Sequence, residues 1–425
     1  MLFSTQQSTA LRTLTVGVSA IALVHTTPAA LADESDRIDE LERQIDSLKE
    51  ELESVRDKVE ADEPAATATD ERVLGPREMA SGSDQVRLTL SGQVNRGILI
   101  TDDGNNTDAF FVDNDNSSTR VRLLGDANLT DDISVGSVIE VQFESNSTAA
   151  VSQDNQSNVG PNNFTERKLE VFADSKSFGR LWLGQGDTAS NGTSEQDLSG
   201  VSVIGYSSVA DLAGGIQFAD GGGNLTGVTI GDTFSNLDGL SRDDRVRYDT
   251  PEYYGTKLSA AAIADDRYDI ALRYGRKLLG AHEFKAAIAY SNASSEFDSV
   301  NGSASVLLGG YVPGVNLTIA AGSRNFEEQG RDDATFFYGK LGYLTQFKGT
   351  LIGDLGETGF AVDYYDGADI DTNGDESASF GLLAVQNVDA IGTEVYAGAR
   401  NYSLDRQGQS FDDVRALLFG VRVKF

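Results

Sequence analysis

The stretch VRALLFGVRVKF (414–425) alternates between two faces along its whole length. A period of two residues is typical of a β-strand, in which successive side chains point to opposite sides of the sheet. One face is wholly apolar, and the other includes two basic residues. The apolar face consists of Leu417, Phe419, Val421, Val423 and Phe425, and the other of Ala416, Leu418, Gly420, Arg422 and Lys424. The stretch therefore predicts a strand with an aromatic residue, Phe425, as its last apolar contact.

The composition of the 425-residue chain excludes a helical membrane protein. Only 39% of the residues are hydrophobic, and no apolar run approaches the roughly 18 residues that a membrane-spanning helix needs. The chain has 45 glycines, six prolines and no cysteine. Such a chain is rich in turns and has no disulfides, which suits a barrel closed by backbone hydrogen bonds.

The net charge of −32, from 66 acidic and 34 basic residues, argues against a nucleic-acid partner. Phosphate binding needs a concentrated positive surface, which this composition does not offer. The acidic residues gather in Asp-rich loops, where they are compatible with a salty habitat or with divalent cations bridging to anionic lipid headgroups. The sequence does not choose between these two explanations.

The first 32 residues predict a secretory signal peptide. Arg12 lies in a polar start, an apolar run extends over 14–24, and Pro28 precedes the sequence Ala30-Leu31-Ala32. This order of a charged region, a short apolar region and an A-x-A site predicts cleavage before Asp33. We therefore expect the mature chain to function beyond the inner membrane.

Residues 33–60 predict a short coiled coil in the periplasm. Apolar residues recur three and four positions apart with charged residues beside them, which is a heptad pattern. The heptad positions are Ile38, Leu41, Ile45, Leu48, Leu52, Val55 and Val59. A helix of about six turns is marginal alone, so we expect it to form with copies of itself. Residues 61–85 show no period and predict a linker.

From Val86 onwards the chain alternates in segments of about ten residues separated by Gly, Asn, Asp and Ser clusters. This is the signature of a transmembrane β-barrel. We count 16 segments over residues 86–425, and an even number places both ends of the barrel on the periplasmic side. The predicted starts are Val86, Thr119, Ile133, Phe164, Gly179, Arg242, Thr256, Tyr268, Ala281, Ser303, Val315, Ala334, Gly359, Ser377, Ala390 and Val414.

The lengths of the connections support this count, because transmembrane barrels have short periplasmic turns and longer external loops. The predicted external connections include 102–118, 146–163, 187–241, 292–302, 325–333 and 404–413. The connection after Gly186 is far too long for a simple hairpin and needs a fold of its own. Its second half, around Gly221-Gly222-Gly223 and Asp232, suggests an extra hairpin.

Residues 86–425 resemble the 16-stranded Gram-negative general porins, in particular those of α-proteobacteria. Six segments carry the resemblance in the order of the family. They are VRLTLSGQVNRG (86–97), FFVDNDNSSTRVRLLGDA (110–127), SFGRLWLGQGDTAS (177–190), DDRVRYDTPEYYG (243–255), GFAVDYYDG (359–367) and LLFGVRVKF (417–425). An N-terminal coiled coil is an addition to the usual porin plan.

This resemblance implies a homotrimer of water-filled barrels in the outer membrane, surrounded by lipid and lipopolysaccharide. It also implies that the third external loop folds inwards and narrows each barrel. The terminal strand with Phe425 resembles the signal that the barrel-assembly machinery reads. The heptad residues lean towards a two-stranded coil, whereas a trimeric barrel favours three strands. The coil resembles segments that reach towards peptidoglycan, which is a candidate partner.

Transport through such a barrel needs an aperture and an electric field rather than catalysis. The resemblance implies basic residues on the barrel wall facing acidic residues on the inserted loop. Parity places Gln93, Asn95, Arg120 and Arg122 in the lumen, and Arg120 also matches the constriction arginine of the family. On the loop, the candidates are Glu195, Asp197, Tyr206 and Asp211.

The strand from Phe164 contains a conflict between the resemblance and the alternation. The family pattern places a wall arginine at Arg167, but alternation with Leu169 and Val171 turns Arg167 outwards and Lys168 inwards. A β-bulge would reconcile the two, so both residues are candidates. The inward sets also include Glu140, Glu144, Glu166 and Glu170, which together with the acidic chain predict mild cation selectivity.

The hexapeptide Asp369-Ile370-Asp371-Thr372-Asn373-Gly374 has the first half of a calcium-binding loop. Phe380 occupies the position where such a loop carries its bidentate glutamate, so a plain acidic external loop is the alternative. Asp113 and Asp115 in the first loop pose the same choice. No cofactor is required for diffusion, and calcium at Asp369, Asp371 and Asn373 is a candidate only.

Two other functional classes compete with a general porin. An enzyme is disfavoured, because His25 leaves with the signal peptide and any histidine-dependent hydrolase would depend on His282 in a periplasmic turn. A structural role is the second alternative, with the coil and linker tethering the envelope and the barrel serving as an anchor. A solute-specific porin is the nearest competitor. Conductance in planar bilayers separates these alternatives.

Overall fold

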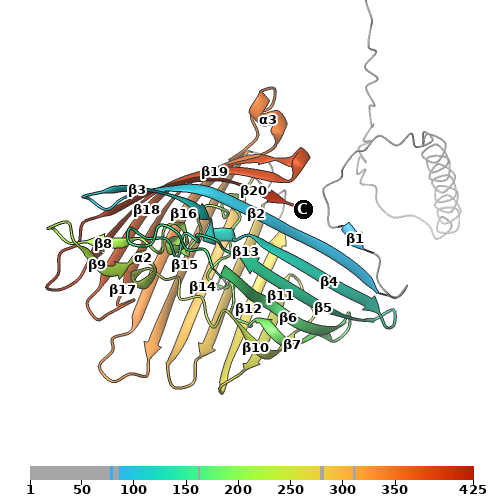
Figure 1. Ribbon diagram of the computed structural model, residues 1–425. Helices are drawn as coiled ribbons and strands as arrows, with labels where there is room; N and C mark the ends of the chain where they lie inside the picture. The colour runs from blue at the N-terminus through green and yellow to red at the C-terminus, as the bar shows by residue number, and fades with distance from the viewer. Residues whose placement is uncertain (1–76, 80–85, 161–162, 278–281, 310–312) are drawn as a thin grey trace, which may run out of the picture. The chain divides into compact units, whose positions relative to one another are not determined.

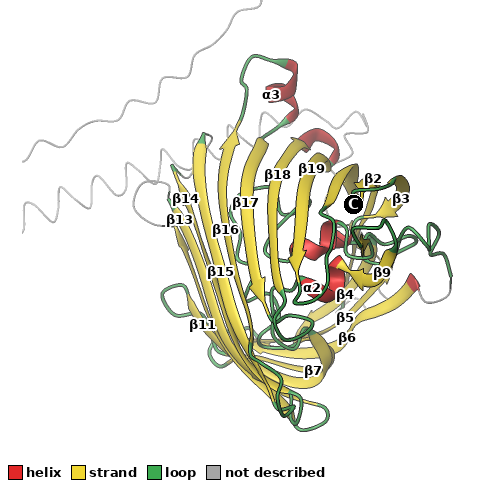
Figure 2. Ribbon diagram, turned by 90° about the vertical axis from the view of Figure 1, so that its left-hand side faces the viewer, coloured by secondary structure: helices red, strands yellow, loops and turns green. Residues whose placement is uncertain are grey.

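The computed structural model describes residues 77–79, 86–160, 163–277, 282–309 and 313–425. In this part of the chain, sixteen antiparallel strands form a barrel (Figures 1 and 2). The strands are β2 (Arg87–Asp102), β4 (Arg120–Asn128), β5 (Ile133–Phe143), β6 (Phe164–Ser175), β7 (Gly179–Asp187), β10 (Arg242–Asp249), β11 (Thr256–Ile263), β12 (Arg267–Lys277), β13 (Glu283–Asn292), β14 (Phe297–Leu308), β15 (Gly314–Phe326), β16 (Ala334–Thr345), β17 (Thr358–Ala368), β18 (Glu376–Val388), β19 (Thr393–Asp405) and β20 (Val414–Lys424). Because β2 pairs with both β4 and β20, the barrel is closed, and the predicted all-β fold is confirmed.

The predicted signal peptide (1–32), coiled coil (33–60) and most of the linker lie outside the described residues. Within the linker, however, β1 (Arg77–Met79) pairs antiparallel with β2 at Leu88–Leu90. The last strand pairs with β2 only as far as Gln93, so β1 covers a part of the β2 edge that β20 does not reach. The sequence predicted a linker without regular structure, but residues 77–79 of it form a strand.

The outer surface of the barrel is an apolar belt. Along β20, Leu417 is 41%, Val421 40% and Phe425 43% exposed, whereas Leu418 on the inner face is fully buried. The outward positions of the other strands carry similarly exposed aliphatic and aromatic side chains. A continuous apolar belt around a closed barrel is the surface that a bilayer covers. The alternation in 414–425 thus separates the outside of the barrel from its lumen.

The strand starts agree with the sequence prediction to within three residues at all positions but one. The exception is the strand predicted from Ser303, which begins at Phe297. The backbone N–H of Ala293 donates to the carbonyl of Phe297 at 2.8 Å and closes a tight hairpin there. The external connection predicted as 292–302 is therefore wrong, and it spans 293–296. The polar run after Asn292 looked like a loop but belongs mostly to the strand.

Long loops gather at one end of the barrel and mostly short turns at the other. The first long loop contains β3 (Thr107–Asp113), which pairs with the upper half of β2, and the 3₁₀ turn η1 (Asp115–Ser117). At the turn end, α3 (Leu351–Leu355) precedes β17 and η4 (Asp389–Ile391) precedes β19. Among the described residues, no helix combines the length and apolar character that crossing a membrane would require.

The third external loop (188–241) folds into the barrel, where α2 is visible between the strands in Figure 2. It contains η3 (Val209–Leu212), the strands β8 (Gln217–Ala219) and β9 (Leu225–Thr229), and α2 (Ile230–Thr233). The pairing of β8 with β9 confirms the extra hairpin that the sequence suggested. At its tip, Gly223 has φ +79°, a conformation that side chains with a Cβ rarely adopt. The loop therefore has a fold of its own.

Candidate pore site

A polar cavity of about 1030 Å³ lies inside the barrel between the third external loop and strands β4–β7 and β10. A second cavity of about 610 Å³ lies towards the turn end and is lined by residues of β6, β7, β10 and β11. Three residues line both cavities: Arg122, Lys168 and Asp187. We call these three residues the neck. The two cavities together run along one side of the lumen.

The basic wall is the set of basic residues on β4, β6, β10 and β20 that line the larger cavity; Arg324 on β15 also lines this cavity and is not counted in the set. Alternation along each strand places them inwards, while their apolar neighbours face out. They are Arg120 and Arg122 on β4, Arg167 and Lys168 on β6, Arg242 at the start of β10, and Arg422 and Lys424 on β20. Of the predicted wall residues, Gln93, Arg120, Arg122, Arg167 and Lys168 line this cavity.

A β-bulge in β6 turns both Arg167 and Lys168 into the lumen. Lys168 pairs with Glu140 of β5, but the next partner of β5, Val141, pairs with Glu166, so Arg167 is the extra residue. The β-bulge considered in the sequence analysis is therefore present, and it explains how the consecutive residues Arg167 and Lys168 can both face the lumen. The same bulge places Glu166 with Val141 on the outer face, where Glu166 is exposed. The predicted inward position of Glu166 is wrong.

The charges on this wall form ion pairs across neighbouring strands. The Nε of Arg167 lies 2.8 Å from Oε1 of Glu140, and a guanidinium nitrogen of Arg120 lies 3.9 Å from the same oxygen. Lys168 forms an ion pair with Asp187. Cross-strand pairs of this kind restrict the orientation of long side chains. The basic wall is thus built by pairing between strands, and it faces the cavity.

Three of the predicted loop residues, Glu195, Tyr206 and Asp211, line the cavity opposite the basic wall. The hydroxyl of Tyr206 donates a hydrogen bond to Asp211, and Ser208 donates a second at 2.8 Å. Asn236 donates to Glu195 at 3.1 Å. The loop therefore presents carboxyl groups that its own polar side chains hold in place.

Burial raises the pKa values of these loop carboxyl groups. Loss of hydration is the largest cause and brings the pKa of Glu195 to about 8, with the nearby charges of Asp238 and Asp211 adding to the shift. Burial likewise raises the pKa of Asp211 to about 7, helped by the charge of Asp115. At neutral pH these two carboxyl groups carry at most part of their full negative charge. The loop is thus less acidic than its sequence suggests.

Two predicted site residues do not line the cavity. Asn95 is fully buried: its Nδ2 donates to the carbonyl of Ser117 at 2.8 Å, and Tyr396 donates to its Oδ1 at 2.6 Å. The 3₁₀ turn η1 supplies this carbonyl and so separates Asn95 from the lumen. Asp197 is buried in an ion pair with Lys340 of β16, which also donates to the carbonyl of Gly205 at 2.8 Å. Asp197 therefore anchors the loop instead of facing the pore.

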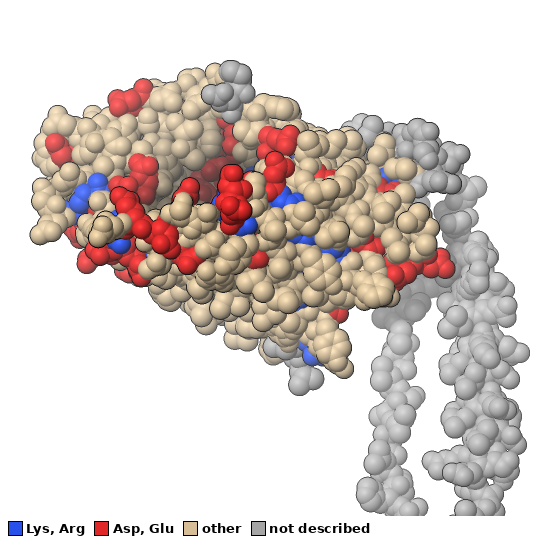
Figure 3. Space-filling model, turned by 90° about the horizontal axis from the view of Figure 1, so that it is seen from below, with Lys and Arg blue, Asp and Glu red and all other residues tan. Residues whose placement is uncertain are grey.

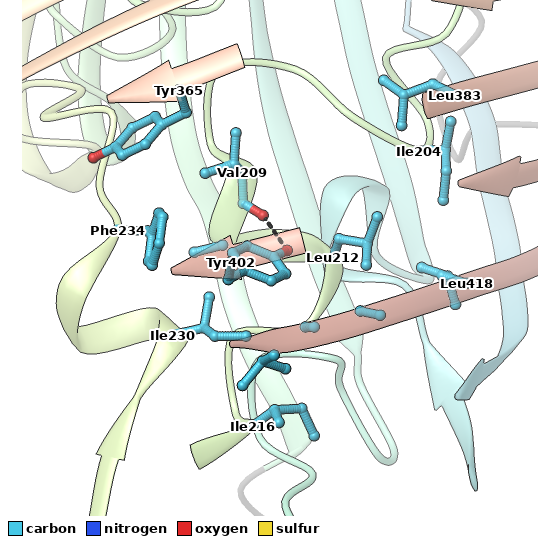
Figure 4. Close-up of a cluster of buried hydrophobic side chains, with 14 of the residues drawn as sticks. Ile204, Val209, Leu212, Ile216, Ile230, Phe234, Tyr365, Leu383, Tyr402 and Leu418 are labelled. Atoms are coloured by element: carbon cyan, nitrogen blue, oxygen red, sulfur yellow. Dashed lines mark hydrogen bonds between the residues drawn. The ribbon is translucent and has the colours of Figure 1, made fainter. Parts of the chain in front are cut away.

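An apolar wall contacts the same loop from β16 to β19 and from the first half of β20, whereas Arg422 and Lys424 near the end of β20 belong to the basic wall. Inward-facing residues of β16 to β20 pack against η3, β8 and α2 of the third external loop (Figure 4). Tyr402 packs edge-on against Phe234 and donates to the carbonyl of Val209 at 2.7 Å. The labelled cluster is Ile204, Val209, Leu212, Ile216, Ile230, Phe234, Tyr365, Leu383, Tyr402 and Leu418. This dry contact fills the lumen side that the cavities leave free.

Sequence reasoning missed several residues of the cavity, and it missed the apolar wall. Arg422 and Lys424 were placed on the inner face of the last strand, so their parity alone could have identified them. Arg242 was read as a strand start. Asp187 ends β7 and Asp238 lies within the third loop, and neither gave a separate signal. The apolar wall had one available signal, since strands after Ala334 carry large apolar residues on both faces.

The candidate calcium residues are engaged with basic side chains. Arg406 lies 2.6 Å from carboxylate oxygens of both Asp371 and Asp375, and Asn373 accepts a hydrogen bond from Arg331 at 2.9 Å. Asp369 accepts from the backbone N–H of Gly374 at 2.6 Å. In the described part of the chain, no group of three or more His, Cys, Asp or Glu residues is placed to hold a metal ion. Calcium binding stays a prediction.

Acidic side chains gather on the face of the molecule shown in Figure 3, with fewer basic ones among them. The excess of acidic residues in the sequence thus appears on the surface. The larger cavity differs, because it has basic residues along one side. The net charge of the chain and the charge of its lumen are therefore separate properties.

Comparison with known proteins shows one family and one fold. The family described as Gram-negative porin matches residues 57–407. An anion-selective porin from Comamonas acidovorans has 14% identity and a TM-score of 0.53, covering 80% of this chain and 100% of its own. OmpT of Vibrio cholerae in a trimer form has 12% identity and a TM-score of 0.51, with 80% and 100% covered. OmpF of Salmonella typhi in complex with daunomycin has 12% identity and a TM-score of 0.50, with 82% and 100% covered. No curated protein sequence matches the chain.

Proposed function

The chain belongs to the Gram-negative porin family and is an outer-membrane channel rather than an enzyme, and we propose that it admits small hydrophilic solutes and ions by passive diffusion. The observation that carries this proposal is the pair of polar cavities inside the barrel that share Arg122, Lys168 and Asp187 in their linings. Charged and hydrogen-bonding walls replace part of the hydration shell of a polar solute, whereas an apolar solute gains nothing there.

Planar bilayers containing the purified protein test the channel directly. We expect stepwise conductance that grows with salt concentration, because ions move through water between charged walls. Bilayers that stay silent at every protein concentration would contradict a diffusion channel. They would support the alternative in which the barrel anchors an envelope tether.

A solute-specific porin is the second candidate, and the apolar wall favours it. The third external loop fills the side of the lumen next to β16–β20, which confines the solute path to the basic wall. A narrow path lined by fixed charges discriminates between solutes more strongly than a wide path does. Current block by one solute at micromolar concentration, without block by others of similar size, would establish this specificity.

Mild cation selectivity was predicted from the acidity of the whole chain together with four inward glutamates, and the surroundings of these glutamates give it little support. Glu140 is paired with Arg167, and Glu170 is paired with Arg245. Glu166 lies on the outer face. Only Glu144 remains as an unpaired candidate, and burial raises its pKa to about 8, so it is mostly neutral at pH 7.

We further propose a homotrimer, as in the trimer form of the Vibrio cholerae relative. Crosslinking of the detergent-solubilised protein should give a species of three chains, and a single-chain species at every protein concentration would oppose this. Residues 33–60 would then join as a three-stranded coil and reach towards peptidoglycan. Removing residues 33–85 should leave conductance intact and abolish co-sedimentation with peptidoglycan, if the coil makes that contact.

The last residue is proposed to direct assembly. The backbone N–H and carbonyl of Phe425 form two hydrogen bonds with Gly92, at 3.0 and 2.8 Å, and so complete the seam between the last strand and the first. Deleting Phe425 should impair insertion far more than removing the tip 221–223 of the third loop, measured as the yield of folded barrel. Equal yields would count against an assembly signal.

A further inference from the structure

The neck between the two cavities holds a positive charge that the protein leaves uncompensated. Lys168 is paired with Asp187, so the only acidic residue of the neck is already engaged. Arg242 approaches the same carboxylate at 3.8 Å. The third neck residue, Arg122, has no ion-pair partner within the described residues, and its buried Nε atom has no hydrogen-bond partner there.

The acidic side chain paired across the strands with Arg122 does not neutralise it. Glu140 is the residue opposite Arg122 in the pairing of β4 with β5. Its carboxylate, however, is bound by Arg167 at 2.8 Å and approached by Arg120 at 3.9 Å. Two arginines thus contact this carboxylate already, and among the described residues Arg122 forms no ion pair with it. A buried N–H donor such as the Nε of Arg122 is costly without a partner unless an anion or water accepts its hydrogen bond.

The carboxyl groups on the opposite side of the cavity do not neutralise the positive charge of Arg122 either. Tyr206 and Ser208 donate hydrogen bonds to Asp211, and Asn236 donates to Glu195, so these groups are held by neutral donors. Burial raises the pKa values of both carboxyl groups towards or above 7. Basic residues outnumber acidic ones in the combined lining of the two cavities, although the chain has a net charge of −32.

We propose that the neck is an anion-binding filter, in which Arg122 holds a small anionic solute with Lys168 beside it. This inference deepens the proposed channel function and depends on it. The ligand is a small solute with a carboxylate or phosphate group, because a guanidinium offers such groups two parallel N–H donors. The filter makes the channel prefer anions at neutral pH, which is the opposite of the preference that the charge of the whole chain suggests.

The zero-current potential in a potassium chloride gradient at pH 7 tests the filter. We expect the wild-type channel to favour chloride over potassium. The Arg122→Gln variant should lower the chloride-to-potassium permeability ratio by about twofold or more, since one charge is removed from the lining that both cavities share. The matched control is Arg415→Gln, which removes the same charge from an exposed position on β20 outside both cavities.

Inorganic phosphate provides a second measurement that needs no variant. Millimolar phosphate should reduce the chloride current through wild-type channels, and Arg122→Gln should weaken this block severalfold while Arg415→Gln leaves it unchanged. If phosphate fails and acetate or succinate blocks, the ligand is a carboxylate and the filter stands. Potassium preference in the wild type, or equal effects of the two variants, overturns the filter but not the channel. Absence of any conductance overturns the channel function itself.

Discussion

The basic wall and the apolar wall face the same loop from opposite sides of one barrel, and they bind it in different ways. The apolar wall of β16–β20 excludes water from its contact with the third external loop. The basic wall, on β4, β6, β10 and the end of β20, is separated from that loop by a cavity of about 1030 Å³. The apolar wall thus holds the loop on one side, and on the other side the loop is separated from the basic wall by the cavity.

The polar residues of the two walls differ in the same way. Behind the loop, Arg400 and Asp363 are fully buried and paired at 2.7 Å, and Lys340 is fully buried with Asp197. On the basic wall, Arg120 and Arg167 remain partly exposed. Buried pairs fix positions, because breaking one leaves an isolated charge in a dry place. The solvated charges of the basic wall instead create an electric field in the lumen, which acts on passing ions.

The largest expected effect is at the buried pair that anchors the loop. Lys340→Met leaves Asp197 charged and buried without its partner, which costs about 3–5 kcal/mol. We expect the third external loop to detach from β16, seen as rapid proteolysis within 188–241 and as a larger, noisier conductance. The barrel itself should persist, because its strands are paired independently of the loop.

The double variant Lys340→Met/Asp197→Asn is the control for this anchor. It removes the stranded charge while the asparagine can still accept the hydrogen bond from the backbone N–H of Ser199, now 2.8 Å from Asp197. Most of the lost loop stability should return. A double variant as unstable as the single one would show that the ion pair is not what holds the loop.

The second prediction concerns the apolar contact. Leu212 on η3 is 1% exposed within the cluster, so Leu212→Ala should cost about 2–5 kcal/mol through lost burial and the cavity left behind. Faster cleavage of 188–241 and a higher mean conductance are expected. Leu129→Ala is the matched control, because Leu129 is 68% exposed in a turn. If both variants leave the loop equally protected, the apolar wall does not restrain it.

The sequence predicts the barrel well because its outer face obeys one rule. Lipid requires apolar residues at every second position, and this rule located the first residues of β5, β6 and β7 correctly. Inside, parity identified Arg120, Arg122 and Gln93 as lumen residues. It could not identify the apolar wall, because Tyr402 contacts Val209 across 193 residues of chain. It also placed Asp197 in the pore, since no local pattern reveals its partner Lys340.

The third prediction uses pH to change the charge that faces the basic wall. The pKa values of Glu195 and Asp211 are raised to about 8 and 7, so both groups bind protons below those values and lose them above. Between pH 6 and 9.5 the loop therefore gains up to two negative charges. The charges of Asp238 and Asp115 add to the rise of the Glu195 and Asp211 pKa values, respectively, and the charge of Arg242 opposes the rise at Glu195.

The expected result is a zero-current potential that moves towards cation preference as the pH rises through this window, by about 10 mV or more. The Glu195→Gln/Asp211→Asn variant should lose most of this shift. Asp354→Asn, in the turn that contains α3, is the control and should keep it. An unchanged potential in the wild type, or a full shift in the double variant, would show that these carboxyl groups do not face the ion path.

The smallest expected effect is at the outer end of the apolar wall, where Asp369–Asp375 joins β17 to β18. Arg406 lies 2.6 Å from carboxylates of both Asp371 and Asp375, so a bound calcium ion would have to displace a guanidinium. Calcium should therefore change the melting temperature of the wild type by less than about 1 °C. Arg406→Gln should make the melting temperature rise with calcium, because it frees two carboxylates for the ion. Arg331→Gln is the matched control, since Arg331 contacts the same turn only through Asn373 and backbone carbonyls. A clear calcium shift in the wild type would mean that Arg406 yields to the ion, and that the turn is a metal site rather than an ion-paired end of the apolar wall.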